Sequence, residues 1–135
     1  MSERNLEKRN APLQAMKLPG LHLIGDFFEC RCDSNRMVDA AWIERHCLKL
    51  VEDASLTPIE HVFHSFGEGD GVTGMVVLAE SHLSLHTWPE EGFVTVDVYV
   101  CNYSADNRGK ARQLFDALIQ TYAPQSPRTF SIDRA

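Results

Sequence analysis

Apolar and polar positions along the chain follow two different periods, and the change of period separates strands from helices. Residues 21–30 carry closely spaced leucines and phenylalanines, which is typical of a strand. Residues 92–101 alternate, with valine at every second position from 94 to 100 and a mixed set between. Successive side chains of a strand point to opposite faces, so this segment predicts a strand with one apolar face. Further strands are predicted over 59–66 and 72–79, and a short one over 129–132.

Apolar residues at spacings of three and four predict two helices. The first follows capping residues at 33–35 and ends before Pro58, and the second begins at Asp106 or Asn107 and ends before Pro124. With a further strand through residues 82–86, the predicted order is strand, helix, four strands, helix, strand. Two helices with one apolar face each and a mostly antiparallel sheet predict an α/β fold, a two-layer α/β sandwich with both helices on one face.

The length of 135 residues predicts one domain, residues 19–135, preceded by a mobile tail over 1–18 that has few large apolar side chains. The net charge of −6 disfavours nucleic acid as a partner and suits a cationic substrate. No apolar run is long enough to cross a membrane, and the first ten residues do not resemble a signal peptide. Four cysteines in such a chain predict free thiols in a reducing, cytoplasmic setting.

Reactive side chains concentrate in residues 79–90, Ala-Glu-Ser-His-Leu-Ser-Leu-His-Thr-Trp-Pro-Glu, between two apolar runs. Strand alternation places His82 and His86 on one face and Ser81 on the other. No Gly, Pro or Asn lies near Glu80 to form an ordinary hairpin turn, so a chain reversal there implies backbone strain of order 1–3 kcal/mol. The alternative is an ordinary hairpin with histidines on its solvent face.

The order of these residues resembles the processing and active-site signature of the short prokaryotic S-adenosylmethionine decarboxylases. Glu80-Ser81-His82 is followed by residues 86–90, His-Thr-Trp-Pro-Glu, and then by Asp97 and Cys101. The resemblance implies an α/β sandwich, a homodimer, and self-cleavage into residues 1–80 (β chain) and 81–135 (α chain). It also implies a pyruvoyl cofactor, made from Ser81 by an N-to-O acyl shift and β-elimination, and a product that donates aminopropyl groups for spermidine synthesis.

The same resemblance implies roles for individual side chains. Glu80 and Ser81 flank the bond that is cleaved, Thr73 matches a hydroxyl donor, and His86 matches the base that removes the Cα proton during processing. The pyruvoyl ketone forms a Schiff base with the substrate amine and accepts the electrons released with CO₂. Cys101 matches the proton donor that follows, and its thiol must then be neutral, with a pKa not far below ~8.5.

Phe66, Trp88 and Glu90 are the substrate-binding candidates, because a sulfonium and an adenine favour aromatic faces and a ribose favours a carboxylate. Trp88 has packing as its alternative role. The N-terminal tail is extra to the family's pattern. Two further features depart from it: the glycine-rich loop 67–70 is one residue longer than usual, and Asn102 stands where glycine is usual. Both border the expected pocket, and they keep arginine and ornithine open as alternative substrates.

Two alternatives belong to other classes of protein. One is a metal site formed by His61, His64, His82 and His86, although the spacing of His82 and His86 suits a helix better than the predicted strand. The other is a non-enzymatic relative that binds a nucleoside and is never cleaved. We expect no metal, no nucleic acid and no membrane; the expected partners are a small-molecule substrate and a second copy of the chain.

Overall fold

The structure, a computed structural model, describes residues 18–102 and 105–135. Its elements in chain order are β1 (Gly20–Cys30), α2 (Asn35–Val38), α3 (Ala40–Asp53), β2 (Pro58–Ser65), β3 (Val72–Leu78), β4 (Ser81–Trp88), the short 3₁₀ helix η2 (Pro89–Glu91), β5 (Phe93–Val100), α4 (Arg108–Tyr122) and β6 (Pro124–Arg134). The predicted order is confirmed, with α2 as an additional short helix. The predicted mobile tail lies almost wholly outside the described residues.

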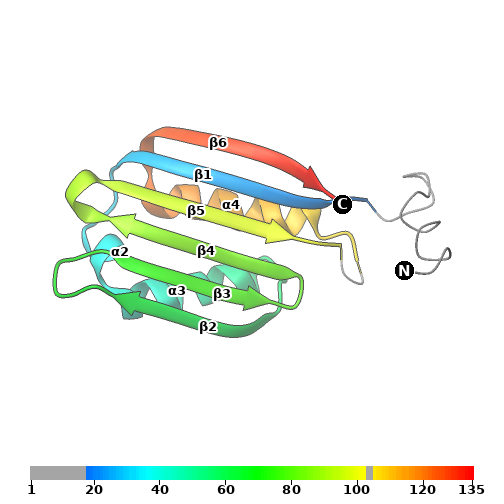
Figure 1. The fold of residues 1–135 in the computed structure, drawn as a ribbon, viewed down its shortest axis with the longest axis horizontal. Helices are drawn as coiled ribbons and strands as arrows, with labels where there is room; N and C mark the ends of the chain where they lie inside the picture. The colour runs from blue at the N-terminus through cyan, green and yellow to red at the C-terminus, as the bar shows by residue number, and fades with distance from the viewer. Residues whose placement is uncertain (1–17, 103–104) are drawn as a thin grey trace, which may run out of the picture.

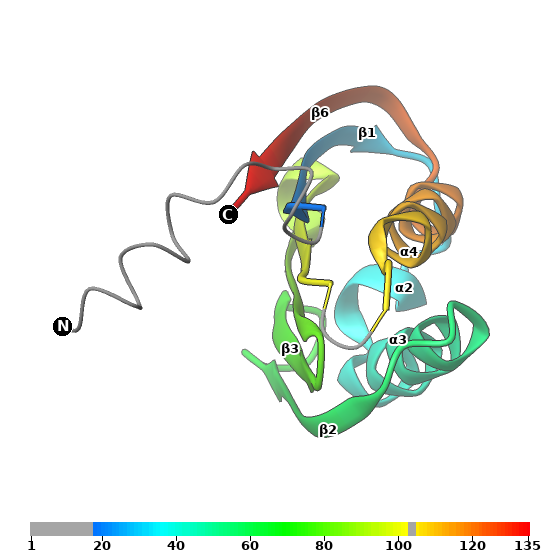
Figure 2. The same ribbon diagram turned by 90° about the vertical axis from the view of Figure 1, so that its right-hand side faces the viewer.

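The six strands form one sheet in the order β2-β3-β4-β5-β1-β6, and every neighbouring pair is antiparallel. Both long helices lie behind the sheet in Figure 1, and Figure 2 shows the sheet curving around them. Helix α3 lies against β2 and β3, and α4 lies against β1 and β5. This is the two-layer α/β sandwich expected from the sequence. None of the described helices is long and apolar enough to cross a membrane.

The valine alternation of β5 sets the position of the core. Its four valines, Val94, Val96, Val98 and Val100, are fully buried toward the helices, whereas the residues between them are partly exposed. Antiparallel pairing extends the same division of faces to the neighbouring strands. The largest fully buried side chains of the other elements are Leu21, Phe27, Ile43, Val51, Val72, Val76, Leu83, Leu85, Leu114, Leu118 and Tyr122.

The predicted first helix is divided into two by Asp39. This residue has extended backbone angles, φ −94° and ψ 95°, and its carboxylate accepts a hydrogen bond of 3.1 Å from the backbone N–H of Trp42. Ser34 makes no side-chain cap at the start of α2. The prediction that residues 33–35 cap the long helix was therefore wrong: Asp39 is the cap, because it supplies a carboxylate to an otherwise unpaired N–H of the first turn.

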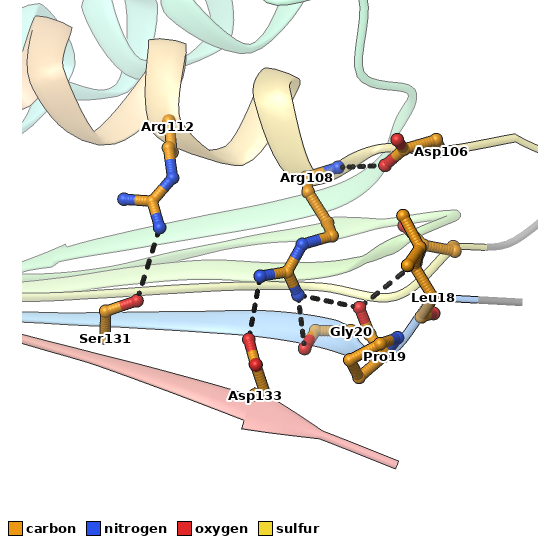
Figure 3. A network of polar contacts seen from close by, with 9 residues as sticks. Leu18, Pro19, Gly20, Asp106, Arg108, Arg112, Ser131 and Asp133 are labelled. Atoms are coloured by element: carbon orange, nitrogen blue, oxygen red, sulfur yellow. Dashed lines mark hydrogen bonds and ion pairs between the residues drawn. The ribbon is translucent and has the colours of Figure 1, made fainter. Parts of the chain in front are cut away.

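Strand β6 is longer than the sequence predicted, since it includes Pro124 and Pro127 as well as residues 129–132. Among the described strands it pairs only with β1 and is an edge strand, where a residue without an N–H is tolerated. Figure 3 shows how Arg108 of α4 joins both strands. Its guanidinium donates to the carbonyls of Pro19 and Gly20 at 2.9 and 3.4 Å, and to the Asp133 carboxylate at 2.7 Å.

Candidate functional site

The chain reverses at Ala79 and Glu80, between β3 and β4, where the sequence lacks the usual turn residues. Ser81 begins β4 with a φ of 157°, a value that residues carrying a Cβ rarely adopt. Strain was expected near this reversal, and the positive φ falls on Ser81 itself. Ser81 pairs across the sheet with Leu78 of β3 and Val100 of β5.

Glu80 is held through both its backbone and its side chain. Its carbonyl oxygen accepts a hydrogen bond of 2.8 Å from the backbone N–H of Cys101. Its carboxylate is buried, with 8% exposure for the residue, and accepts from the backbone N–H and hydroxyl of Thr57 at 3.0 and 3.1 Å. The backbone N–H of Ala79 donates to the Thr57 carbonyl at 2.9 Å. The peptide bond between Glu80 and Ser81 is thus fixed beside Cys101.

The sheet face away from the helices carries a polar cluster close to Ser81. The Ser81 hydroxyl lies 3.5 Å from Nδ1 of His82, whose ring packs edge-on against Tyr99. His22 Nε2 lies 3.0 Å from an Asp97 carboxylate oxygen. Burial lowers the pKa of His82, His22 and Arg134 lower it further, and Asp97 opposes them. A neutral His82 imidazole beside the Ser81 hydroxyl can accept or relay a proton.

Thr73 and His86 form a second polar pair, with 3.1 Å between the hydroxyl oxygen and Nδ1. They line a pocket of about 430 Å³ together with all three substrate-binding candidates, Phe66, Trp88 and Glu90. Its remaining lining residues are Asp70, Gly71 and Thr87. Position 71 requires glycine, because a Cβ there would lie 2.2 Å from the Thr87 carbonyl oxygen. A few polar groups among aromatic faces, in a volume of this size, are typical of a small-molecule site.

The structure divides the predicted site residues into two groups at opposite ends of β4 (Figure 1). Ser81, Glu80 and Cys101 lie at its start, and Thr73 pairs with His86 near its end. His86 lies five positions after Ser81 along β4, which is about 16 Å at the rise of an extended strand. Within one chain, therefore, His86 and Thr73 are not in reach of Ser81.

Two residues were not found from the sequence: Thr57 at the cleavage turn and His22 in the polar cluster on the sheet. Thr57 follows α3 in a stretch without a recognisable motif, so no local signal marks it as the partner of Glu80. His22 belongs to an apolar strand, 75 positions from Asp97 in sequence. Both contacts join segments far apart in the chain, and a sequence pattern reports only local neighbours.

Asn102, which departs from the family's pattern, has a structural role. Its buried side-chain amide donates to the carbonyl of Pro19 at 3.1 Å and also to that of Leu18. Its side-chain oxygen accepts from the backbone N–H of Asn107 at 2.9 Å. A glycine cannot make these bonds, so Asn102 ties the segment after Cys101 to the start of β1.

The positions of the cysteines and histidines bear on the alternative of a metal site, because both side chains are common metal ligands. Cys30, Cys32, Cys47 and Cys101 are free thiols. Burial, with a smaller contribution from Cys32, raises the pKa of Cys30 to about 12, and its thiol donates to the Phe27 carbonyl. His61 pairs with Glu44 of α3 at 3.1 Å, whereas His82 and His86 lie on the sheet face away from the helices. Over residues 18–102 and 105–135, no group of three or more His, Cys, Asp or Glu is placed to hold a metal ion.

The chain is similar to known S-adenosylmethionine decarboxylases along most of its length. A family model described as S-adenosylmethionine decarboxylase matches residues 21–135. The S-adenosylmethionine decarboxylase proenzyme of Pseudomonas aeruginosa is 38% identical over 106 residues, 78% of this chain and 64% of that protein. The chain thus spans less than two thirds of the length of this relative. The proenzyme of Pyrobaculum aerophilum is 35% identical over 86% of this chain and 88% of its own length.

A solved structure gives the same result. The crystal structure of the adenosylmethionine decarboxylase from Aquifex aeolicus has a TM-score of 0.76 and 34% identity, and the match covers 88% of this chain and 92% of that one. Sequence and fold therefore agree over nearly the whole described region. The chain belongs to the S-adenosylmethionine decarboxylase family.

Proposed function

We propose that this chain is a proenzyme that cleaves itself between Glu80 and Ser81 and then decarboxylates S-adenosylmethionine through a pyruvoyl group at residue 81. The geometry of this peptide bond carries the proposal: Ser81 has a φ of 157°, and the Glu80 carbonyl accepts from Cys101 N–H at 2.8 Å. The product would serve as the aminopropyl donor in polyamine synthesis. The four free thiols fit a reducing, cytoplasmic setting.

Self-cleavage begins with the Ser81 hydroxyl oxygen attacking the Glu80 carbonyl carbon. As the new C–O bond forms and the C–N bond breaks, the hydroxyl proton passes to the Ser81 nitrogen, which leaves an ester and a free amine. Negative charge develops on the Glu80 oxygen during this step. The Cys101 N–H already donates to that oxygen and would stabilise the charge. β-Elimination would then remove the Cα proton of residue 81 and release residues 1–80 with a free Glu80 carboxylate. Water would hydrolyse the resulting dehydroalanine to the pyruvoyl group and ammonia.

The residues around Ser81 fit such a group. A pyruvoyl group supplies a carbonyl that condenses with an amine and withdraws electrons from the bond to the departing carboxylate. Cys101 follows Val100, the direct cross-strand partner of Ser81, so its thiol belongs to the same end of the sheet. We assign Cys101 as the proton donor. Phe66, Trp88 and Glu90 would hold the adenosyl group in the pocket beside His86.

We further propose that a second copy of the chain completes each site. The partner's His86 and Thr73 would supply the base and the hydroxyl, because those of the same chain lie about 16 Å away along β4. The sheet face away from the helices supports this arrangement. It exposes large apolar side chains from five strands, namely Phe28, Val62, Met75, Val77, Trp88, Phe130 and Ile132. Two such faces related by a twofold axis would cover each other.

Self-cleavage is tested by the mass of the purified protein under denaturing conditions. We expect two fragments, corresponding to residues 1–80 and 81–135, with the second blocked at its N-terminus and reducible by borohydride. Ser81→Ala should remain a single full-length chain, because alanine has no hydroxyl to attack the carbonyl. Ser84→Ala, a matched serine change in the same strand, should cleave. A wild-type chain that stays intact after long incubation would disprove the proposal.

The substrate is tested by CO₂ release from carboxyl-labelled S-adenosylmethionine, arginine and ornithine with cleaved protein. We expect release from S-adenosylmethionine alone, since a ribose and a cation next to an aromatic face, worth ~0.5–2 kcal/mol, use the whole pocket. Trp88→Ala and Glu90→Gln should raise KM for S-adenosylmethionine more than they slow self-cleavage. Release from arginine or ornithine alone would overturn the substrate assignment and leave the cleavage mechanism intact.

A further inference from the structure

We propose that Thr57 is a positioning residue for self-cleavage, which holds Glu80 so that its carbonyl stays aligned with Cys101 and Ser81. This inference rests on the proposed function. Thr57 lies between α3 and β2 and is not part of the pattern of reactive residues in 79–90. It contacts the residue whose carbonyl carbon is attacked, and it acts on the reaction through that residue.

Three hydrogen bonds join Thr57 to the cleavage turn. Its N–H and hydroxyl donate to the two oxygens of the Glu80 carboxylate at 3.0 and 3.1 Å, and its carbonyl accepts from Ala79 N–H at 2.9 Å. The Glu80 residue is 8% exposed. A buried carboxylate is costly without such donors, so Glu80 has one favourable position, the one that faces Thr57.

The position of the Glu80 side chain determines that of its backbone. With the carboxylate held by Thr57, the carbonyl on the other side of the same Cα is directed to Cys101 N–H, 2.8 Å away. With Glu80 held in this position, Ser81 adopts a φ of 157° at the start of β4. If Glu80 were free, the turn could relax to a common conformation and remove the strain on the scissile bond.

The contact between Thr57 and Glu80 acts on the first covalent step. In that step the Ser81 oxygen bonds to the Glu80 carbonyl carbon, the C–N bond breaks, and the hydroxyl proton moves to the nitrogen. Reacting atoms must be held close to the attack geometry, and a shift of about 1 Å costs on the order of 100-fold in rate. Thr57 and Glu80 both precede the cleavage site, so the contact remains within one chain after cleavage.

The rate of self-cleavage in newly made protein tests this role. A labelled pulse of cell-free synthesis followed by a chase gives proenzyme of uniform age, and denaturing gels give the rate. We expect Thr57→Val, which has the same shape but no hydroxyl, to slow cleavage by about 3- to 10-fold, because one donor to a carboxylate is lost while the backbone N–H remains. Thr57→Ser, which restores the hydroxyl, should cleave at nearly the wild-type rate.

Matched variants distinguish positioning from general loss of stability. Thr129→Val changes an exposed threonine of β6 and should cleave normally. Glu80→Gln should also slow cleavage, and adding Thr57→Val to it should cost less than in the wild type, because both changes weaken one contact. Circular dichroism confirms that each variant is folded. If Thr57→Val does not fold, the other two variants still test the role of the contact. We expect Thr57→Ser to cleave at nearly the wild-type rate and Glu80→Gln to cleave slowly.

The outcomes separate this inference from the proposed function. If wild type cleaves and folded Thr57→Val cleaves within twofold of it, Thr57 has no positioning role and the proposed function stands. Equal slowing in Thr57→Ser and Thr57→Val would show that the hydroxyl is not the group that acts, and would overturn the inference. If wild type does not cleave, both proposals are wrong.

Discussion

Cys101 contributes to the site through two different groups. Its backbone N–H donates to the Glu80 carbonyl at 2.8 Å, whereas its thiol is free and partly exposed. In the proposed mechanism the backbone N–H would stabilise the charge that develops during self-cleavage, and the thiol would later protonate the product. A side-chain substitution changes the second function and leaves the first in place, so the two functions can be separated experimentally.

Cys101→Ala should therefore cleave itself but turn over slowly. We expect complete conversion to the two fragments and a fall in kcat of about 100- to 10,000-fold, the usual effect of removing a general acid. Intact mass and CO₂ release measure the two quantities on the same sample. Cys32→Ala, a change of another partly exposed thiol, is the control, and we expect it to cleave and to turn over substrate like the wild type. Unchanged turnover in fully cleaved Cys101→Ala would exclude Cys101 as the proton donor.

Edge strand β6 is held by its pairing with β1 and also by a side chain of α4. Arg108, on the first turn of α4, bonds to two carbonyls at the start of β1 and to Asp133 near the end of β6 (Figure 3). One side chain thus joins a helix to both strands beside it. Arg112, one turn later, makes a single longer contact of 3.5 Å with Ser131.

Arg108→Met should lower the free energy of unfolding by about 1–2 kcal/mol. Its bonds to the carbonyls are charge-assisted, while the pair with the exposed Asp133 is screened by water and contributes less. Urea denaturation of the Ser81→Ala background keeps the chain in one piece during the measurement. Arg112→Met in the same background is the matched control, with an expected change below about 0.5 kcal/mol. Equal losses in both variants would contradict the assigned role of Arg108.

The two groups of candidate site residues lie at opposite ends of β4, and this separation predicts an active site shared between two protomers. Each complete site would use Ser81 and Cys101 of one protomer with the partner's His86 and Thr73. Sedimentation at micromolar concentration should show a dimer. A protein that sediments as a monomer while cleaving normally would contradict the shared site.

Complementation between two inactive variants tests the shared site directly. Ser81→Ala should not cleave, and His86→Ala should stop at the ester, which hydroxylamine cleaves. When the two chains are co-expressed with different tags, the mixed dimer contains one site with both residues intact. We expect the His86→Ala chain to be processed in that dimer, with about half the wild-type activity per dimer. No processing in isolated mixed dimers would show that each chain must supply its own His86.

Most of the helices and strands, and the candidate site residues, could be predicted from local patterns in the sequence. The four valines of β5 are buried as their alternation predicted, and both long helices lie on one face. Phe66, Trp88 and Glu90, chosen for their chemistry, line one pocket. These properties follow from local geometry: the periods of a strand and a helix are fixed by the chain itself, and apolar faces must be buried.

Which distant residues meet depends on the pairing of the strands and on the packing of the sheet against its helices. Pairing register places Cys101 against Glu80 and separates Ser81 from His86, although the sequence places all of them in one motif. It also brings Thr57 to the Glu80 carboxylate, and it makes β6 an edge strand that accepts two prolines. None of these contacts leaves a local pattern, because each depends on how segments far apart in the chain align when the whole sheet packs on its helices.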